Sequence, residues 1–439
     1  MSKIKIFFYV YVIKTMGGGL MQLVAYGAQD IYLTGNPQIT FFKVVYRRHT
    51  NFSMESIAQT FNGTADFGGS VSATISRNGD LVHRMYLEHD AAFESKASNN
   101  SIAVCCDYGS HLMKEVELEI GGQRIDKHYG HWHSVYSQLT ESNPTGSQDT
   151  LFNKMCGNGT GTDSMETTVT RNGFTNSSPN TPQLSTAKLF IPLYFWFCRN
   201  PGLALPLIAL QYHEVKVKIT FETIDNLTAN DTDAGNFAAA NTTAGAKKSA
   251  AGNDFKLWAD YIYLDTDERR RFAQVSHEYL IEQLQYESKS GGTMDLNFNH
   301  PVKELIWSGV RVTGTDAFSD TVPAQAENLY ERPTISGAST YQLKLNGHDR
   351  FKERDYRYFT RTQIWESHTG YGSSGVPDSI AVYSFALKPE EHQPSGTCNF
   401  SRIDNAQLVD GNATAINVYA VNYNVLRIMS GMGGLAYSN

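Results

Sequence analysis

One stretch of the sequence brings together residue types that bind metals. In VELEIGGQRIDKHYGHWH, residues 116–133, three histidines (His128, His131 and His133) lie within six residues, and Asp126 lies just upstream. Imidazole nitrogens and carboxylates are the common protein ligands of transition metals such as zinc. The spacing H-x-x-H-x-H, however, matches no standard zinc pattern such as HExxH. We therefore predict a strand and its turn here, with the three histidines as the chain's only metal candidates.

A second copy of this strand-and-turn pattern favours a structural role. VELEIGGQRIDK (116–127) resembles YQLKLNGHDRFK (341–352), because each is an alternating strand followed by Gly-Gly or Asn-Gly and a polar turn. The later copy has only His348 at its turn and no histidine pair behind it. Since the module recurs without its metal ligands, we expect His131 and His133 to serve packing or a contact between subunits.

The other reactive residue types form no catalytic pattern. Cys105 and Cys106 are adjacent, a spacing that rarely ligates one tetrahedral ion, and Cys398 has no neighbouring base. The sequence has no G-x-S-x-G motif, and the glycine-rich segments 16–20 and 431–435 lack the spacing of phosphate-binding loops. We therefore predict that the protein is not an enzyme, has no catalytic residue and binds no cofactor.

Alternation of apolar and polar residues with a period of two predicts an all-β fold, because successive side chains of a strand point to opposite faces. The segments that show it best are 71–75, 116–120, 215–221 and 341–345. Longer apolar stretches predict strands covered on both faces at 190–197, 255–264 and 416–428.

Helical patterns are scarce, and the best is 264–274, where Asp265 or Thr266 can cap the helix. Many short strands joined by long polar loops indicate a sandwich, jelly roll or barrel. Because the paired features fall on either side of 264–274, we predict two similar β-domains joined by that helix. The long loops are 140–187, 226–254 and 314–339.

Composition excludes some functions. The 439 residues carry a net charge of −7, so no overall basic field favours binding of nucleic acid, and five cysteines are too few for a disulfide framework.

The apolar run 6–13 is too short to span a bilayer, and residues 1–15 form an optional extension if Met16 is a second start. Ten Asn-x-Ser/Thr sequons lack a credible signal peptide, so glycosylation sites remain unassigned.

Several long segments resemble the major capsid proteins of large icosahedral double-stranded DNA viruses, with the similarity greatest to those of the algal chloroviruses. Among them are GLMQLVAYGAQDIYLTGNPQITFFKVVYRRHTNF (19–52), NPGLALPLIALQYHEVKV (200–217), SFALKPEEHQPSGTCNFSRIDNAQL (384–408) and NYNVLRIMSGMGGLAYSN (422–439). The resemblance runs from about Met16 to the last residue and departs in the loops 140–187 and 314–339. The chain is therefore either the principal capsid protein or a paralogue of it.

The resemblance implies a double jelly roll: two eight-stranded β-sandwiches in tandem, with three chains forming a capsomer of pseudo-hexagonal outline. On this mapping residues 1–41 are an N-terminal arm, 42–265 the first jelly roll, 266–277 a linker helix and 278–439 the second jelly roll. Trimers would tile an icosahedral shell, after assembly in the host cytoplasm, with outer loops facing the host.

The implied partners are two further copies in a homotrimer, neighbouring capsomers, minor capsid proteins and host cell-surface glycans, without direct contact to nucleic acid and without a transmembrane segment. The alternative is a virion-surface carbohydrate-binding protein on the same scaffold, which needs aromatic and carboxylate side chains in one cavity. Only 328–333 and 354–368 have that composition.

Overall fold

The computed structural model describes most of the chain, which divides into the units Met1–Asn51 and Phe52–Asn439. Of the first unit it describes only residues 28, 42 and 49–51, so nearly all of the expected arm at 1–41 lies outside the described residues. In the second unit it describes 52–95, 102–104, 107–141, 151–157, 170–171, 174–176, 184–233, 236–239, 246–249, 252–310, 340–370, 372, 378–411 and 415–437.

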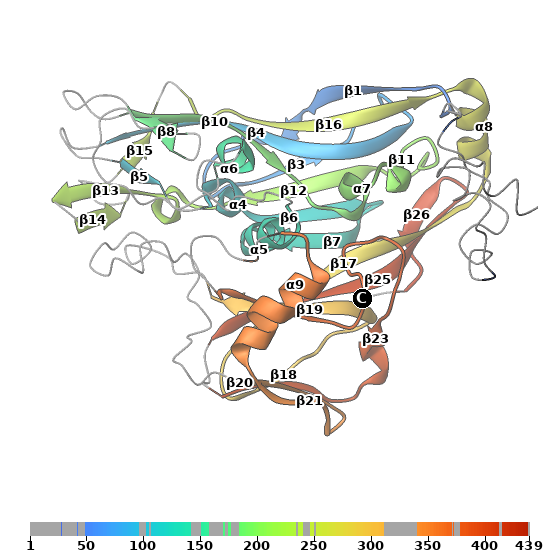
Figure 1. Ribbon diagram of the computed structural model, residues 1–439. Coiled ribbons are helices and arrows are strands. Elements are labelled where there is room, and N and C mark those ends of the chain that lie inside the picture. The colour runs from blue at the N-terminus through green and yellow to red at the C-terminus, as the bar shows by residue number, and fades with distance from the viewer. Residues whose placement is uncertain are drawn as a thin grey trace, which may run out of the picture. The chain divides into compact units, whose positions relative to one another are not determined.

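The first half of the second unit is a sandwich of two antiparallel sheets (Figure 1). One sheet has the order β1 (Phe52–Gln59), β16 (Phe255–Leu264), β4 (Leu81–Ser95), β10 (Leu184–Pro192), β9 (Phe174–Asn176) and β8 (Thr170–Arg171), with β11 (Leu205–Pro206) and β15 (Ala246–Lys248) paired to β4. The facing sheet has the order β2 (Phe61–Asn62), β3 (Ser70–Thr74), β12 (Val215–Phe221), β6 (Met113–Ile120) and β7 (Gln123–Tyr129).

Shorter elements decorate this first sandwich. A small sheet joins β14 (Asn236–Ala239), β13 (Thr228–Asp233) and β5 (Ile102–Val104). The helical elements are α4 (Tyr108–Leu112), α5 (Gly130–Thr140), α6 (Leu151–Cys156), α7 (Trp196–Arg199), η1 (Pro201–Leu203) and η2 (Ile224–Asn226). Helix α8 (Thr266–Gln274) then leads to the second half; the Asp265 carboxylate accepts a hydrogen bond from Thr266 N, as expected of a cap.

The second half repeats the sandwich. One sheet has the order β17 (His277–Lys289), β25 (Ile416–Met429), β19 (Pro301–Gly309) and β22 (Ile380–Ser384), with β23 (Cys398–Asn399) and β26 (Met432–Leu435) at its margins. The other has the order β18 (Thr293–Asp295), β24 (Ala406–Asp410), β20 (Thr340–Leu345) and β21 (His348–Asp355). The π-helical turn η4 (Tyr358–Thr362), α9 (Gln363–Ser367) and η5 (Phe400–Arg402) complete this half.

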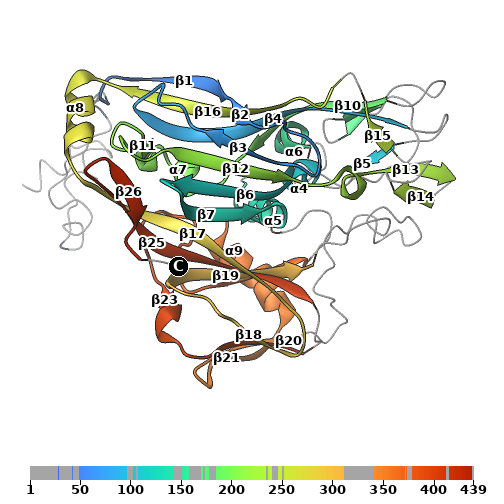
Figure 2. The ribbon, with the colours of Figure 1, turned by 180° about the vertical axis from the view of Figure 1, so that it is seen from behind.

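The two sandwiches have the same topology. With the eight principal strands of each half numbered in chain order, one sheet pairs them 1-8-3-6 and the other 2-7-4-5 in both halves. This order is a jelly roll, so the predicted double jelly roll is confirmed. The view from behind in Figure 2 shows the four sheets layered in the same succession as Figure 1.

The two similar sequence segments form equivalent hairpins. β6 and β7 meet at Gly121-Gly122 (φ 59° and 84°), and β20 and β21 meet at Asn346-Gly347 (φ 50° and 79°). A two-residue hairpin of this type needs positive φ at both central positions, which glycine and asparagine tolerate best. The repeat seen in the sequence is therefore a repeat of the same strand pair.

Each sandwich buries its own apolar core between its sheets. Leu118, Val217 and Leu257 are fully buried in the first, and Trp307, Leu343 and Leu408 in the second. Burial of each such side chain contributes about 1.5–3 kcal/mol relative to exposure. All four segments in which apolar and polar residues alternate are strands: 71–75, 116–120, 215–221 and 341–345. Their apolar residues point into the core, and the residues between them point outward.

Two sequence predictions need correction. The apolar stretch 190–197 is a strand only to Pro192, after which the chain turns into α7. Residues 130–133 were expected to belong to a strand and its turn, but they begin helix α5 (Gly130–Thr140). Nearly every residue of α5 is buried, so the sequence shows no amphipathic period that would have revealed a helix. No helix among the described residues is long and apolar enough to cross a membrane.

We predict that the two hairpin glycines differ in their tolerance of a methyl group. A Cβ on Gly122 meets nothing within 4 Å, whereas a Cβ on Gly121 would lie 2.3 Å from His213 Nδ1. Gly122→Ala should cost only the left-handed backbone strain, about 1–2 kcal/mol. Gly121→Ala should cost about 1–3 kcal/mol more through overpacking. Urea unfolding midpoints of both variants test this, and equal midpoints would contradict it.

Candidate functional site: the contact between the two sandwiches

The two sandwiches are joined by an apolar cluster of their own. Helix α5 of the first sandwich directs Trp132, Val135, Tyr136 and Leu139 onto the outer face of the β17-β25-β19-β22 sheet of the second. The ring centroids of Trp132 and Tyr419 are 5.1 Å apart. The sheet contributes Ile306, Ile380, Val382, Tyr419 and Val421, all of them buried. This contact has the composition of a protein core, which makes it a fixed joint.

The second sandwich also completes the hydrogen bonding of α5. The last carbonyl groups of a helix have no partner within the helix. Here the nitrogen of Gly370 donates to Leu139 O at 2.8 Å, and the nitrogen of Gly372 donates to Gln138 O at 2.9 Å. The Thr369 hydroxyl donates to Thr140 O at 3.3 Å. The end of α5 is thus capped by a segment more than 200 residues later in the chain.

Buried charges surround the apolar cluster. The Lys303 side chain is only 2% exposed, lies 2.8 Å from Glu282 Oε1 and donates to Pro389 O at 2.6 Å. The other Glu282 oxygen lies 2.8 Å from Arg199 Nη1 of the first sandwich, and Arg199 also donates to Tyr136 Oη at 2.9 Å. Burial alone would raise the pKa of Glu282, but the charges of Arg199 and Lys303 outweigh burial and hold that pKa below its usual value.

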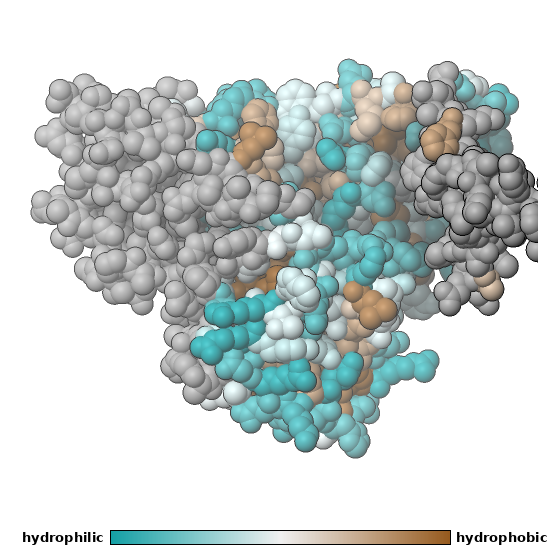
Figure 3. Space-filling model, in the orientation of Figure 1, coloured by the Kyte–Doolittle hydropathy of each residue, from teal (hydrophilic) through white to brown (hydrophobic). Residues whose placement is uncertain are grey.

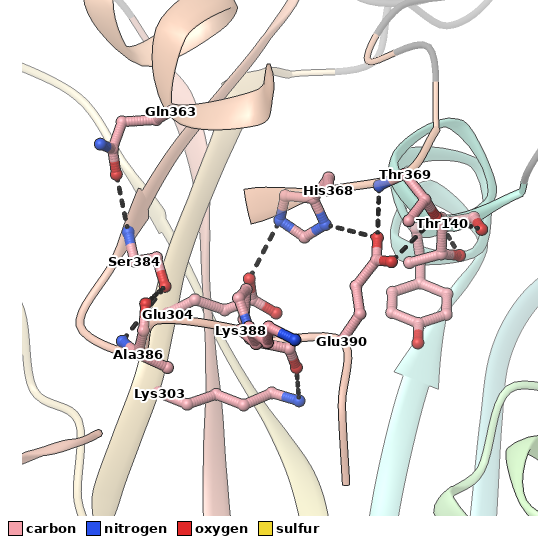
Figure 4. A network of polar contacts seen from close by, with 12 residues as sticks. Thr140, Lys303, Glu304, Gln363, His368, Thr369, Ser384, Ala386, Lys388 and Glu390 are labelled. Atoms are coloured by element: carbon pink, nitrogen blue, oxygen red, sulfur yellow. Dashed lines mark hydrogen bonds and ion pairs between the residues drawn. The ribbon is translucent and has the colours of Figure 1, made fainter. Parts of the chain in front are cut away.

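His368 lies at the centre of a second charged group (Figure 4). Its Nε2 is 3.1 Å from Glu304 Oε2 and its Nδ1 is 3.0 Å from Glu390 Oε1. Burial lowers the pKa of His368, but the two carboxylates outweigh burial and raise it to about 9. His368 is therefore a cation at neutral pH, and Glu390 accepts two further hydrogen bonds from Thr369.

The sequence-predicted metal candidates lie beside this contact. Asp126 accepts a hydrogen bond from Leu284 N of the second sandwich at 3.1 Å, and its other oxygen is 2.9 Å from His128 Nε2. His131 Nδ1 is 2.7 Å from the Tyr419 hydroxyl, so this histidine also joins the two sandwiches. His131 and Asp126 thus take part in the contact between the two halves of the chain.

His133 points instead into the first sandwich. Its ring packs edge-on against Tyr194, and burial lowers its pKa well below the usual value, so it is neutral. In the part of the chain that the structure describes, neither ring nitrogen of His133 has a hydrogen-bond partner. Among those same residues no group of three His, Cys, Asp or Glu side chains is arranged to hold a metal ion. That the histidines bind no metal stays a prediction.

The other candidates from the sequence fall in different places. Cys105, Cys106 and 328–333 lie outside the described residues. Burial raises the pKa of the Cys198 thiol to about 12 and also raises the pKa of Cys398, so neither is a thiolate nucleophile at neutral pH. In 354–368 the Tyr358 ring packs against Phe359 and against Arg354, whose guanidinium lies 4.3 Å from the Tyr358 ring centroid, whereas Trp365 is exposed.

Sequence reasoning missed the charged residues of the contact. Their only local signal is the Lys303-Glu304 pair inside the otherwise apolar strand segment PVKELIWSG. Charged side chains in a strand that is buried throughout need partners, and that requirement could have marked them. The partners themselves, Arg199 and His368, are too distant in sequence to be assigned without the fold.

Two jelly rolls in tandem, fixed to each other by a buried contact, define a structural protein of the double jelly-roll class. Residues 40–265 match the family described as "Major capsid protein N-terminus", and residues 268–434 match "Large eukaryotic DNA virus major capsid protein". The chain belongs to the major capsid proteins of large eukaryotic DNA viruses, which form the icosahedral capsid.

Individual relatives agree with this assignment. The major capsid protein of Pyramimonas orientalis virus is 51% identical, and that of Paramecium bursaria Chlorella virus 1 is 42% identical; each match covers 97% of this chain and all of the relative. A quasi-atomic structure of the PBCV-1 virus capsid has a TM-score of 0.70 at 37% identity, covering 91% of this chain and all of that one. The predicted resemblance to chlorovirus proteins is confirmed, and the Pyramimonas orientalis virus protein is more similar still.

We predict that the charged group around His368 stabilises the protein less in mildly alkaline solution. The pKa of His368 is raised from 6.5 to about 9 on folding, so the folded state binds the proton more tightly. This stabilisation is fully present below pH 6.5 and is lost as the pH rises through 9, an effect of about 3 kcal/mol. Urea unfolding at several pH values should show the loss in the natural protein and not in His368→Gln. Parallel pH profiles for the two proteins would refute it.

The buried and exposed lysine pairs provide a matched comparison. Lys303→Met leaves Glu282 and the Pro389 carbonyl without their buried cation, so we expect a loss of about 3–5 kcal/mol in the free energy of unfolding. The pair Lys388–Glu391 is exposed on both sides, so Lys388→Met should change stability by no more than about 1 kcal/mol. Denaturant titrations measure both, and similar effects at the two sites would rule out a structural role for the buried network.

Proposed function

We propose that three copies of this chain form a homotrimeric capsomer of pseudo-hexagonal outline, which contacts neighbouring capsomers and minor capsid proteins in the virion shell. The observation that carries this proposal is that the two sandwiches share one strand order and are held by a buried joint. Three chains with two similar modules each offer six similar edges, and such a unit can tile a hexagonal lattice.

The proposal also assigns the parts of the chain. Residues 42–265 and 278–439 are the two jelly rolls, 266–277 the linker, and 1–41 an arm that contacts other subunits. The loops at one end of the sandwiches face the host cell and its glycans, assembly takes place in the host cytoplasm, and the chain has no catalytic activity of its own. The raised thiol pKa values at Cys198 and Cys398 support the last point for those two residues.

The trimer can be tested directly by native mass spectrometry of the purified full-length chain. We expect a species of three times 48.9 kDa that survives dilution to low micromolar concentration, because obligate interfaces are large and apolar. A chain that stays monomeric at every accessible concentration would overturn the proposal. Saturable sugar binding that needs no trimer would instead support the carbohydrate-binding alternative.

A further inference from the structure

The apolar core of the first sandwich contains residues that come from the second sandwich. Ile281 of β17 and Leu426 and Ile428 of β25 are fully buried in this core, and Tyr279 and Leu435 pack against it. The two halves of the chain therefore share the first core, in addition to the contact that α5 makes between them.

The second core does not depend on the first sandwich in the same way. Among the described residues, every buried member of the second core lies between 294 and 420, within the second sandwich. Strand β25 contributes Ile416, Val418 and Ala420 to it, whereas Leu426 and Ile428, farther along the same strand, belong to the first core. On the face that Figure 3 shows, the surface over the second sandwich is largely hydrophilic, as expected where a module covers its own core. The dependence between the two cores is therefore one-sided.

The end of β25 and strand β26 form a hairpin, residues 426–435, that lies directly on the first core. In Figures 1 and 2 β26 extends from the second sandwich to the end of the first sandwich near α8. A Cβ on Gly433 would lie 2.6 Å from Leu210 Cδ2 and 3.2 Å from Ile120 Cγ2, so the backbone of β26 touches these side chains. Leu210 and Ile120 are both fully buried, and removal of β26 would open them to water.

Hydrogen bonds fix the 426–435 hairpin to the same end of the first sandwich. The nitrogen of Leu435 donates to Gln123 Oε1 at 3.3 Å, and Gln123 is the first residue of β7. His213 Nδ1 lies 2.9 Å from Gly433 O. The hairpin is thus bonded to the start of β7 and to the segment that precedes β12, and it closes the end at which β6 turns into β7.

The order of the strands along the chain gives this contact a consequence for folding. All described strands of the first sandwich lie between residues 52 and 264, whereas the hairpin begins only at residue 426. During synthesis the domains of a protein fold as units, the N-terminal one first. The first sandwich therefore leaves the ribosome with one end of its core uncovered, and that end stays uncovered until β17, β25 and β26 have been made.

We propose that the 426–435 hairpin makes the first sandwich competent for assembly only after the second sandwich has been synthesised and folded. Before the hairpin binds, the first sandwich opens locally around Leu210 and Ile120, because few apolar contacts hold that end together. After it binds, both sandwiches are closed, so that incomplete chains do not enter the shell. The consequence for assembly rests on the proposed trimer, whereas the completion of the first core by the hairpin does not.

Two neighbouring glycines of β26 provide a matched test in the full-length chain. Gly433→Ala places a methyl group against Leu210 and Ile120, whereas the methyl group of Gly434→Ala meets only the end of the Gln123 side chain, at 3.3 Å. We expect Gly433→Ala to lower the hydrogen-exchange protection of β6 and β12 about tenfold, through overpacking, and to leave β20 and β24 unchanged. Gly434→Ala should leave all four strands unchanged. Equal protection of β6 and β12 in the two variants, measured by mass spectrometry, would overturn the inference.

A chain that stops after Ser430 lacks β26 and provides a stronger perturbation. We expect β6 and β12 to lose protection while β20 and β24 keep it, and native mass spectrometry should detect no trimer at concentrations at which the natural chain is trimeric. A chain that stops after Tyr437 keeps the hairpin and should match the natural chain in both measurements.

The two measurements separate this inference from the proposed function. If the chain without β26 forms trimers as readily as the natural chain, or loses protection equally in both cores, the inference is wrong and the trimer stands. If the natural chain is never trimeric, the proposed function is wrong, and the exchange measurements still decide whether the hairpin completes the first core.

Discussion

The structure depends on one constraint: the outer face of the β17-β25-β19-β22 sheet is apolar and must be covered. In the second sandwich that face is covered by α5, and the buried charges of Arg199, Glu282 and Lys303 border the same contact. Apolar packing supplies the attraction, since each buried side chain contributes about 1.5–3 kcal/mol. The buried ion pairs fix the positions of the residues that they join more than they add net stability, because the cost of desolvating the charges offsets much of their attraction. Together they fix the relation of two modules that would otherwise move independently.

A fixed relation between modules is what a shell protein needs. If the joint between the sandwiches were flexible, three chains could not present six regularly spaced edges, and errors in angle would accumulate across a lattice.

Much of the fold could be predicted from the sequence, and the remainder could not for physical reasons. The strands at 116–120 and 341–345 show the period of two because one face is buried and the other is not. Helix α8 has no buried residue, and it has acidic residues in its first turn and an arginine in its last turn, the order that favours a helix. Helix α5 gave no such pattern, since it is buried on all sides. The partners of Lys303 and Glu304 come from segments distant in the chain, which only the folded topology brings together.

The most direct test of this account is a cryo-electron microscopy structure of the purified, assembled protein. We predict a particle with threefold symmetry in which the two sandwiches of every chain keep one fixed angle, with α5 buried on the β17-β25-β19-β22 sheet. A particle without threefold symmetry, or one in which the two sandwiches of one chain adopt variable angles, would contradict it.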